Sequence, residues 1–117
     1  MSLWSSIRVG RTAGKAAKVY RDVMGRPPSA GDAEYLMNMA SLGVDEHNLA
    51  FDLLMRELKG KSYMDVDGSI VTEYPQKNDP MTQKIIQTLN WIMQTKKIRE
   101  TMIAEMESDL AKIMGSK

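Results

Sequence analysis

The chain has 117 residues, of which 43% are hydrophobic and 26% charged, and its formal net charge is +1. This length predicts one domain with a modest core. The absence of cysteine excludes a disulfide framework, a cysteine nucleophile and a cysteine metal site, and it fits a reducing compartment. No apolar run approaches the roughly 20 residues that span a bilayer, and residues 1–24 lack the continuous apolar core of a secretory signal. The sequence leaves the localisation otherwise open.

The N-terminal segment is basic and is predicted to be helical. Residues 1–26 carry six lysines and arginines against one acid, Asp22, so the remainder of the chain is net acidic. A helix that begins near Ser2 places Leu3, Trp4 and Ile7 on one side. Gly10 weakens a continuous helix at that point, whereas residues 12–24 have a better helical pattern with an alanine-rich apolar edge. We treat residues 1–18 as a basic arm.

This basic arm has several interpretations that the sequence does not separate. Its cations could bind the phosphates of a nucleic acid. They could instead attract the arm to an anionic membrane surface, with Leu3, Trp4 and Ile7 immersed. A targeting segment has a similar composition. The alternative is a solvated face that pairs with acidic residues of this chain or of a partner. The candidate phosphate-binding residues are Arg8, Arg11, Lys15, Lys18 and Arg21.

Residues 19–60 form a predicted module of short helices. Three apolar segments each end at a glycine, Gly25, Gly43 or Gly60, and glycine past a helix end supplies a left-handed capping residue. Ser29 and Asp45 are placed as N-caps of the two helices that follow. The apolar residues of both helices recur mostly at intervals of three or four, as on one face of a helix. We expect two short antiparallel helices that are stable only when packed.

The same module resembles a known family. The run Val-Tyr-Arg-Asp-Val-Met-Gly-Arg-Pro-Pro at 19–28, followed by Gly31, Tyr35, Leu42, Gly43 and Val44, is similar to a short helical repeat of secreted and surface proteins. That repeat carries a Tyr-x-x-Leu-Gly-Arg-x-Pro signature and has no known function. Phycobilisome linker domains are similar in layout. Met24 stands where the repeat usually has Leu, and Leu36 where it often has Trp. The resemblance covers about a third of the chain and implies a helical scaffolding or linker role without catalytic residues.

Residues 61–78 change to a strand pattern and a polar loop. Two runs rich in strand-forming residues flank Asp67 and Gly68, a favoured pair for a two-residue type I′ turn. An isolated hairpin is marginally stable, so we expect it to pack on the helices or to join a partner's sheet. The segment also resembles part of a calcium loop, but Tyr63 and Tyr74 occupy the positions of the first ligand and the bidentate glutamate. No metal site is predicted.

Residues 79–117 are predicted to form one long helix. Asp79 is a natural N-cap with Pro80 at the first helical position, and Gly115 follows as a C-terminal cap. The half that follows Lys96 and Lys97 has a regular apolar seam. This seam either forms a coiled coil with another chain or folds back on its own domain. The sequence leaves open whether this helix bends near Lys96. The seam consists of Ile103, Met106, Leu110 and Ile113.

The sequence contains no motif that predicts an enzyme. The single histidine, His47, lies early in a helix beside Glu46, and no Ser-His-Asp set or glycine-rich phosphate loop is present. No cofactor is expected. We therefore interpret the chain as a mainly α, single-domain structural or adaptor protein of a larger assembly, such as a virion or a multi-subunit complex. Nucleic-acid binding and membrane attachment through residues 1–11 are the alternatives. The residues expected to bind a partner protein or a second copy are Leu3, Trp4, Ile7, Ile103, Met106, Leu110 and Ile113.

Overall fold

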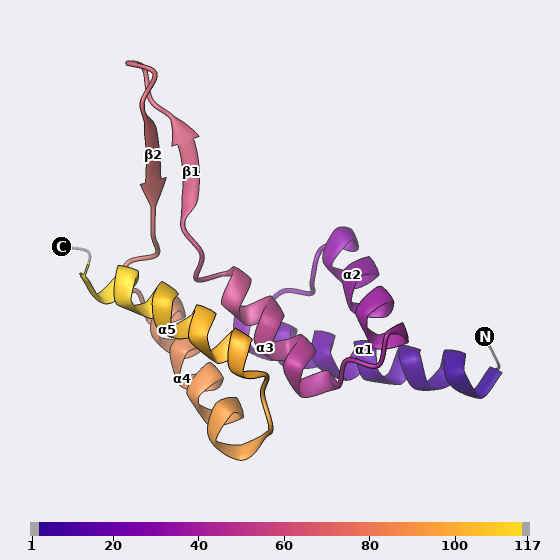
Figure 1. Ribbon diagram of the computed structural model, residues 1–117. Coiled ribbons are helices and arrows are strands. Elements are labelled where there is room, and N and C mark those ends of the chain that lie inside the picture. The colour runs from indigo at the N-terminus through magenta and orange to yellow at the C-terminus, as the bar shows by residue number, and fades with distance from the viewer. Residues whose placement is uncertain (1–2, 116–117) are drawn as a thin grey trace.

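The computed structural model describes residues 3–115 and confirms a mainly α protein with one small hairpin. Helices α1 to α3 come first, the antiparallel strands β1 and β2 follow, and α4 and α5 complete the chain (Figure 1). No helix among these residues is both long and apolar enough to cross a membrane. The elements are α1 (Leu3–Met24), α2 (Ala30–Ser41), α3 (Glu46–Arg56), β1 (Lys61–Met64), β2 (Ile70–Glu73), α4 (Pro80–Thr95) and α5 (Glu100–Gly115).

Helix α1 is continuous where the sequence predicted a weak point at Gly10. It runs for 22 residues and crosses the boundary that we placed between residues 18 and 19. Its buried side includes Ala13, Ala16 and Tyr20. The two alanines are small enough to let α2 and α3 pack closely against α1. Burial of this face offsets the helix-weakening effect of Gly10, because tertiary packing supplies most of the stability of a helix.

The predicted N-caps are confirmed at three helices. The Ser29 hydroxyl oxygen accepts the Asp32 N–H at 3.1 Å at the start of α2. Asp45 accepts the N–H groups of His47 and Asn48, both at 2.9 Å, at the start of α3. Asp79 accepts the Met81 N–H at 2.8 Å at the start of α4. Each of these side chains therefore pairs backbone donors that lack a partner inside the helix.

The glycines that end the first three helical segments serve two different purposes. Gly25 and Gly43 have φ values of 74° and 91°, as expected for left-handed caps. Gly60 does not adopt a positive φ, so its predicted role as a left-handed cap is wrong. A β-carbon at Gly60 would lie 2.7 Å from side-chain atoms of both Thr72 and Tyr74. Glycine is needed there because the end of the hairpin passes close to the backbone.

The hairpin projects away from the helices, and its turn differs from the predicted one (Figure 1). A type I′ turn requires a positive φ at both central residues, but only Gly68 has one, at 85°. The Gly68 N–H donates to the Asp65 carbonyl at 3.0 Å, and the Asp65 N–H donates to the Ser69 carbonyl at 2.8 Å. These bonds define a three-residue loop, 66–68, with a glycine bulge. Asp67 keeps an ordinary backbone conformation.

The predicted long C-terminal helix is divided into α4 and α5, which corrects the expectation of one rod. The chain leaves the helical conformation at Lys96, where φ is −129° and ψ is 160°. Asn48 of α3 is 5% exposed and explains the break. Its side-chain oxygen accepts the Arg99 N–H at 3.0 Å, and its side-chain nitrogen donates to the Lys97 carbonyl at 3.1 Å. A buried side chain thus pairs with backbone groups in an extended linker.

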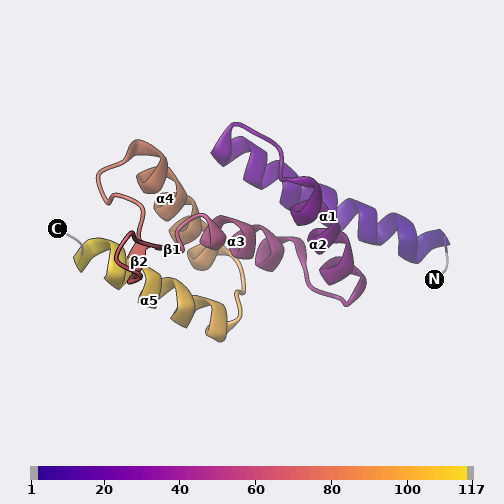
Figure 2. The ribbon, with the colours of Figure 1, turned by 90° about the horizontal axis from the view of Figure 1, so that it is seen from above.

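Helix α3 lies at the centre of the fold, because it packs against α1, α2 and α4. Seven of its eleven residues are buried, more than the single apolar face that the sequence predicted. Figure 2 shows α5 on the side of α3 that faces away from α1. All five helices contribute to one cluster of buried apolar residues, including Tyr20, Leu36, Phe51, Leu89 and Ile113. The N-terminal turns of α1 extend beyond α2 in both views (Figures 1 and 2).

Candidate partner-binding surfaces

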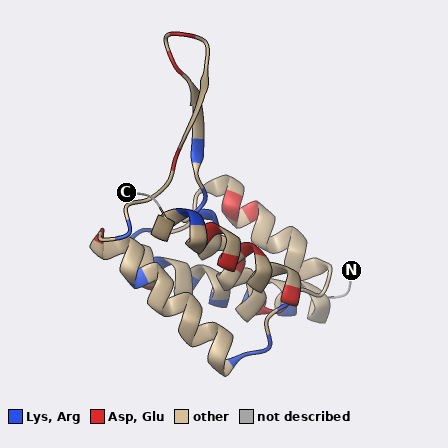
Figure 3. Ribbon diagram, turned by 60° about the vertical axis from the view of Figure 1, so that its left-hand side comes forward, with Lys and Arg blue, Asp and Glu red and all other residues tan. Residues whose placement is uncertain are grey.

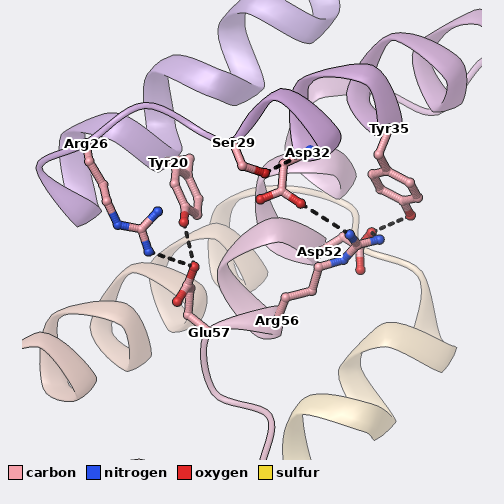
Figure 4. Close-up of polar contacts among 8 residues, drawn as sticks. All are labelled: Tyr20, Arg26, Ser29, Asp32, Tyr35, Asp52, Arg56 and Glu57. Carbon is pink, nitrogen blue, oxygen red and sulfur yellow. Dashed lines mark hydrogen bonds and ion pairs between the residues drawn. The ribbon is translucent and has the colours of Figure 1, made fainter. Parts of the chain in front are cut away.

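Two tyrosine–carboxylate–arginine clusters connect the first two helices to α3 (Figure 4). In the first, the Tyr20 hydroxyl donates to Glu57 Oε1 at 2.5 Å, and Arg26 Nη2 lies 3.2 Å from the same oxygen. Burial raises the pKa of Tyr20 to about 12, and the hydrogen bond to Glu57 and the negative charge of that residue add to the increase. The phenol therefore remains protonated and cannot act as a base at neutral pH.

The second cluster repeats this chemistry between α2 and α3. The Tyr35 hydroxyl donates to Asp52 Oδ2 at 2.5 Å, and burial followed by this hydrogen bond raises the pKa of Tyr35. The Arg56 guanidinium lies 3.9 Å from the centre of the Tyr35 ring and forms ion pairs of 3.6 Å with Asp52 and Asp32. Every charged group in the cluster has a partner of opposite charge. Both clusters hold helices together.

A third polar cluster lies at the linker between α4 and α5. Asp45 accepts a hydrogen bond from the Asn48 side-chain nitrogen at 2.9 Å, and Asn48 in turn binds the linker backbone. A hollow of about 440 Å³ lies beside these residues. Among residues 3–115 no three His, Cys, Asp or Glu side chains are grouped so that they could hold a metal ion. The polar groups in this region are used to shape the backbone.

The C-terminal seam is not a free surface, which corrects one half of the predicted partner-binding set. Met106 is 2% exposed and Ile113 is fully buried, and both belong to the core. Ile103 and Leu110 are partly buried and pack against that core. The seam folds back on its own domain, which was the alternative to a coiled coil. The linker at 96–99 makes this possible, because it lets α5 turn back beside the domain.

The N-terminal apolar residues, by contrast, lie on the surface. Leu3, Trp4 and Ile7 are 74%, 77% and 43% exposed. Trp4 and Ile7 line a hollow of about 280 Å³ together with Arg8 and Arg11. We call these five residues the arm surface. Large exposed side chains that are contiguous rather than scattered are typical of interaction sites.

The cations of α1 lie on the side of the helix opposite its buried face. Arg8, Arg11, Lys15 and Lys18 follow a spacing of three or four residues, so they share one face, and all are exposed. Arg21 is also exposed but lies to one side of this row. Lys15 and Lys18 are partly neutralised by Glu46 at 3.7 Å and Asp22 at 3.2 Å. Within the described part of the chain, neither Arg8 nor Arg11 forms an ion pair.

Sequence reasoning did not identify the tip of the hairpin as a separate surface. Met64, Val66 and Ile70 are 70%, 103% and 65% exposed, so the hairpin does not pack its apolar residues on the helices. Acidic residues occupy the tip, as the red segments in Figure 3 show. The apolar residues around an acidic turn were visible in the sequence. Only the structure shows that nothing in residues 3–115 covers them.

Comparisons with protein-family models, with curated proteins and with solved structures gave no match to this chain. The resemblance of residues 19–60 to a helical repeat of surface proteins therefore stays a prediction. Inference about function must start from the surfaces described above.

Proposed function

We propose that this chain is a non-enzymatic structural or adaptor protein that docks within a larger assembly through the arm surface. The observation that carries the proposal is the exposure of Leu3, Trp4 and Ile7 at the projecting end of α1. Their burial against a partner would remove from water the most exposed apolar cluster on the helices, and apolar burial contributes about 25 cal/mol per Å². A virion or a multi-subunit complex is the kind of assembly that such a module fits.

Three features support docking rather than catalysis. The tyrosine, carboxylate and arginine groups that could do chemistry are paired with one another in the two clusters on α3. Arg8 and Arg11 border the apolar residues and provide directional contacts, and arginine and tryptophan are enriched among residues that dominate interface energies. The body of the protein is held by a single core, so the arm surface projects from a rigid support.

The test is the native size of the chain in extracts of the cells that produce it. We expect elution in a complex well above the 13.2 kDa of the single chain. Replacing Trp4 and Ile7 by serine should shift elution to the small form, since the apolar contact is lost. Trp91→Ser is the matched control, because Trp91 is 59% exposed on α4, away from the arm. Elution at the small size before any substitution would contradict the proposal.

The row of cations on α1 favours nucleic-acid binding as the second candidate function. Four positive side chains on one helical face suit a series of phosphate contacts. Binding of a short duplex should then weaken steeply as salt increases, with a slope of log K against log salt of roughly −3 to −4. Replacing Arg8 and Arg11 by glutamine should reduce that slope by about two. A slope near zero would exclude this function.

Peripheral membrane attachment uses the same exposed residues with lipid as the partner. The exposed Trp4 with neighbouring arginines is the observation in its favour. Sedimentation with anionic vesicles should be lost when residues 1–11 are removed. The deletion leaves all the buried residues of α1 in place. Equal sedimentation of the intact and shortened chains would reject attachment by this segment.

A further inference from the structure

The tip of the hairpin carries an apolar side chain between two acids. Val66 is fully exposed and is flanked in sequence by Asp65 and Asp67, both of which are also exposed. Asp65 Oδ1 accepts the Val66 N–H at 2.8 Å, and Asp67 Oδ1 accepts the N–H and hydroxyl of Ser69. These bonds hold the carboxylates in place beside Val66. Both residues are exposed, so their carboxylates are open to a partner.

The arm surface has the complementary arrangement. Its hollow is lined by Trp4 and Ile7 and bordered by Arg8 and Arg11. A hollow of about 280 Å³ is large enough for a valine side chain, and the two guanidinium groups would then lie beside the two carboxylates. Arginine binds carboxylates through two parallel hydrogen bonds, which gives such a contact direction as well as charge. The apolar parts match apolar parts, and the charges have opposite signs.

These two surfaces cannot meet within one chain. The hairpin rises beside α5 near one end of the molecule, whereas the arm surface lies at the opposite end of its 54 Å length (Figures 1 and 2). The base of the hairpin is packed against the body. Its end passes tightly over Gly60, and Tyr74 packs against the core. The partner of each surface must therefore belong to another molecule.

We propose that the occupant of the arm surface is the hairpin tip of a second copy of this chain. The inference rests on the proposed docking function and names the partner of that surface. Because a tip and an arm are different surfaces, the contact is head-to-tail, and a pair of copies keeps one free tip and one free arm. Association therefore continues beyond a dimer, into rings or chains. The contact is small, so it belongs to the weak class of interfaces.

The first measurement is the mass of the purified full-length chain by sedimentation velocity between about 1 µM and 1 mM, a range that covers weak association. We expect the mass to increase with concentration past that of a dimer and to decrease at high salt, because screening weakens the ion pairs. A constant mass of 13.2 kDa over this range would overturn the inference. It would leave the proposed docking function standing if the native complex in extracts still depended on Trp4.

Two variants test the hairpin tip and the arm surface separately. The tip variant combines Asp65→Asn, Val66→Ser and Asp67→Asn, which removes the charges while the amide oxygens still accept the turn hydrogen bonds. The arm variant combines Trp4→Ser, Arg8→Gln and Arg11→Gln, all at exposed helical positions. Each variant alone should remain monomeric. Self-association of either one at the level of the unchanged chain would contradict the inference.

The decisive result is the mixture of the two variants. The tip variant keeps an intact arm and the arm variant keeps an intact tip, so an equal mixture has one productive contact. We expect a 1:1 dimer that does not grow further, because its outer surfaces are the substituted ones. A mixture that stays monomeric would show that the tip and arm do not bind each other. One that grows beyond a dimer would show that other surfaces drive the association, and it would also contradict the inference.

A matched control keeps the same number and kind of changes away from both surfaces. Trp91→Ser with Lys96→Gln and Lys97→Gln removes one exposed tryptophan and two exposed cations at the end of α4. This variant should associate like the unchanged chain. If it also becomes monomeric, general charge or hydrophobicity would explain the association, and the specific contact would be rejected. Urea unfolding of all three variants should match that of the unchanged chain, because every altered residue is exposed.

Discussion

The two ends of the chain carry similar apolar patterns on helices, yet they have opposite fates. Residues Ile103 to Ile113 of α5 form a regular seam, and two of its four positions, Met106 and Ile113, are buried. Leu3, Trp4 and Ile7 of α1 have the same three-to-four spacing but remain exposed. The spacing alone therefore does not decide between a core and a docking surface. The decision depends on whether the chain can turn so that the helix meets its own domain.

The backbone break at 96–99 accounts for this difference. The continuous helix that the sequence predicted through Lys96 would carry the seam away from the core. The buried Asn48 side chain instead binds the backbone of the linker, and α5 turns back. The N-terminal turns of α1 have no such break, and α1 is continuous from Leu3 to Met24. They project beyond α2 and have nothing to fold against.

The largest effect on the free energy of unfolding is expected at Ile113, a buried apolar residue of α5. Ile113→Ala should lower the free energy of unfolding by about 3 kcal/mol, because it removes buried methyl groups and leaves a cavity. Ile113→Val should cost only about 1 kcal/mol, which provides a graded control. Urea denaturation monitored by circular dichroism measures both. A loss below about 0.5 kcal/mol for the alanine variant would mean that α5 does not contribute to the core.

The next largest effect is expected at Asn48, whose side chain binds the linker between α4 and α5. Asn48→Ala should lower the free energy of unfolding by about 2 kcal/mol, because the Arg99 N–H and the Lys97 carbonyl lose their partner in a partly buried place. Asn38→Ala on α2 is the control, since Asn38 is exposed and its side chain makes no such contact. Equal losses in the two variants, measured by urea denaturation, would show that the bridge does not stabilise the linker.

A smaller effect on the free energy of unfolding is expected at Tyr20, in the cluster that holds α1 on α3. Tyr20→Phe should cost about 1 kcal/mol by removing the hydrogen bond to Glu57. The folded pKa of Tyr20 is raised from 10.0 to about 12, so the folded state favours the protonated phenol. Its contribution is complete below pH 10 and is lost as the pH rises toward 12. The stability difference between the two proteins, measured by urea denaturation, should therefore shrink between pH 10 and 12.

The matched control for this titration is Tyr63→Phe. Tyr63 is exposed on the hairpin, and its bond to Glu73 is open to solvent. Its removal should change the free energy of unfolding by only a few tenths of a kcal/mol. If the difference between the unchanged protein and Tyr20→Phe stays constant up to pH 12, the Tyr20 phenol is not selectively protonated in the fold.

The smallest effect on stability is expected at the arm surface. Trp4→Ala should change the free energy of unfolding by no more than about 0.5 kcal/mol, because an exposed side chain contributes little to a fold. The same change should abolish assembly. This contrast with Ile113 is the sharpest form of the comparison between the two ends. A loss of about 2 kcal/mol or more in urea denaturation would place Trp4 in the core.

Local chemistry made several features predictable. Ser29, Asp45 and Asp79 were identified as caps from the sequence, because an N-cap depends only on residues within one turn. The strands on either side of Gly68 were predicted by their composition, although the detailed turn was not. The arm residues were identified as candidates from their spacing and charge. Each of these inferences uses neighbours along the chain.

Other features depended on residues distant in sequence. Asn48 and Arg99 are separated by 51 positions, so the sequence around Lys96 left a bend open but did not show the contact that causes the break. The near-complete burial of α3 required neighbours from both halves of the chain. Gly60 is needed because Tyr74 passes over it, and not because of its own conformation. The exposed hairpin tip could be recognised only once the remaining chain was seen not to cover it.

By itself the sequence determined where α2, α3 and α4 begin and roughly where the two strands lie, because capping and periodicity are local interactions. It also determined which faces are apolar. Only the tertiary structure decided which of those faces are covered, since burial depends on the direction in which each helix leaves its linker. One buried asparagine sets that direction for α5, and the absence of a comparable constraint leaves the first turns of α1 and the tip of the hairpin exposed.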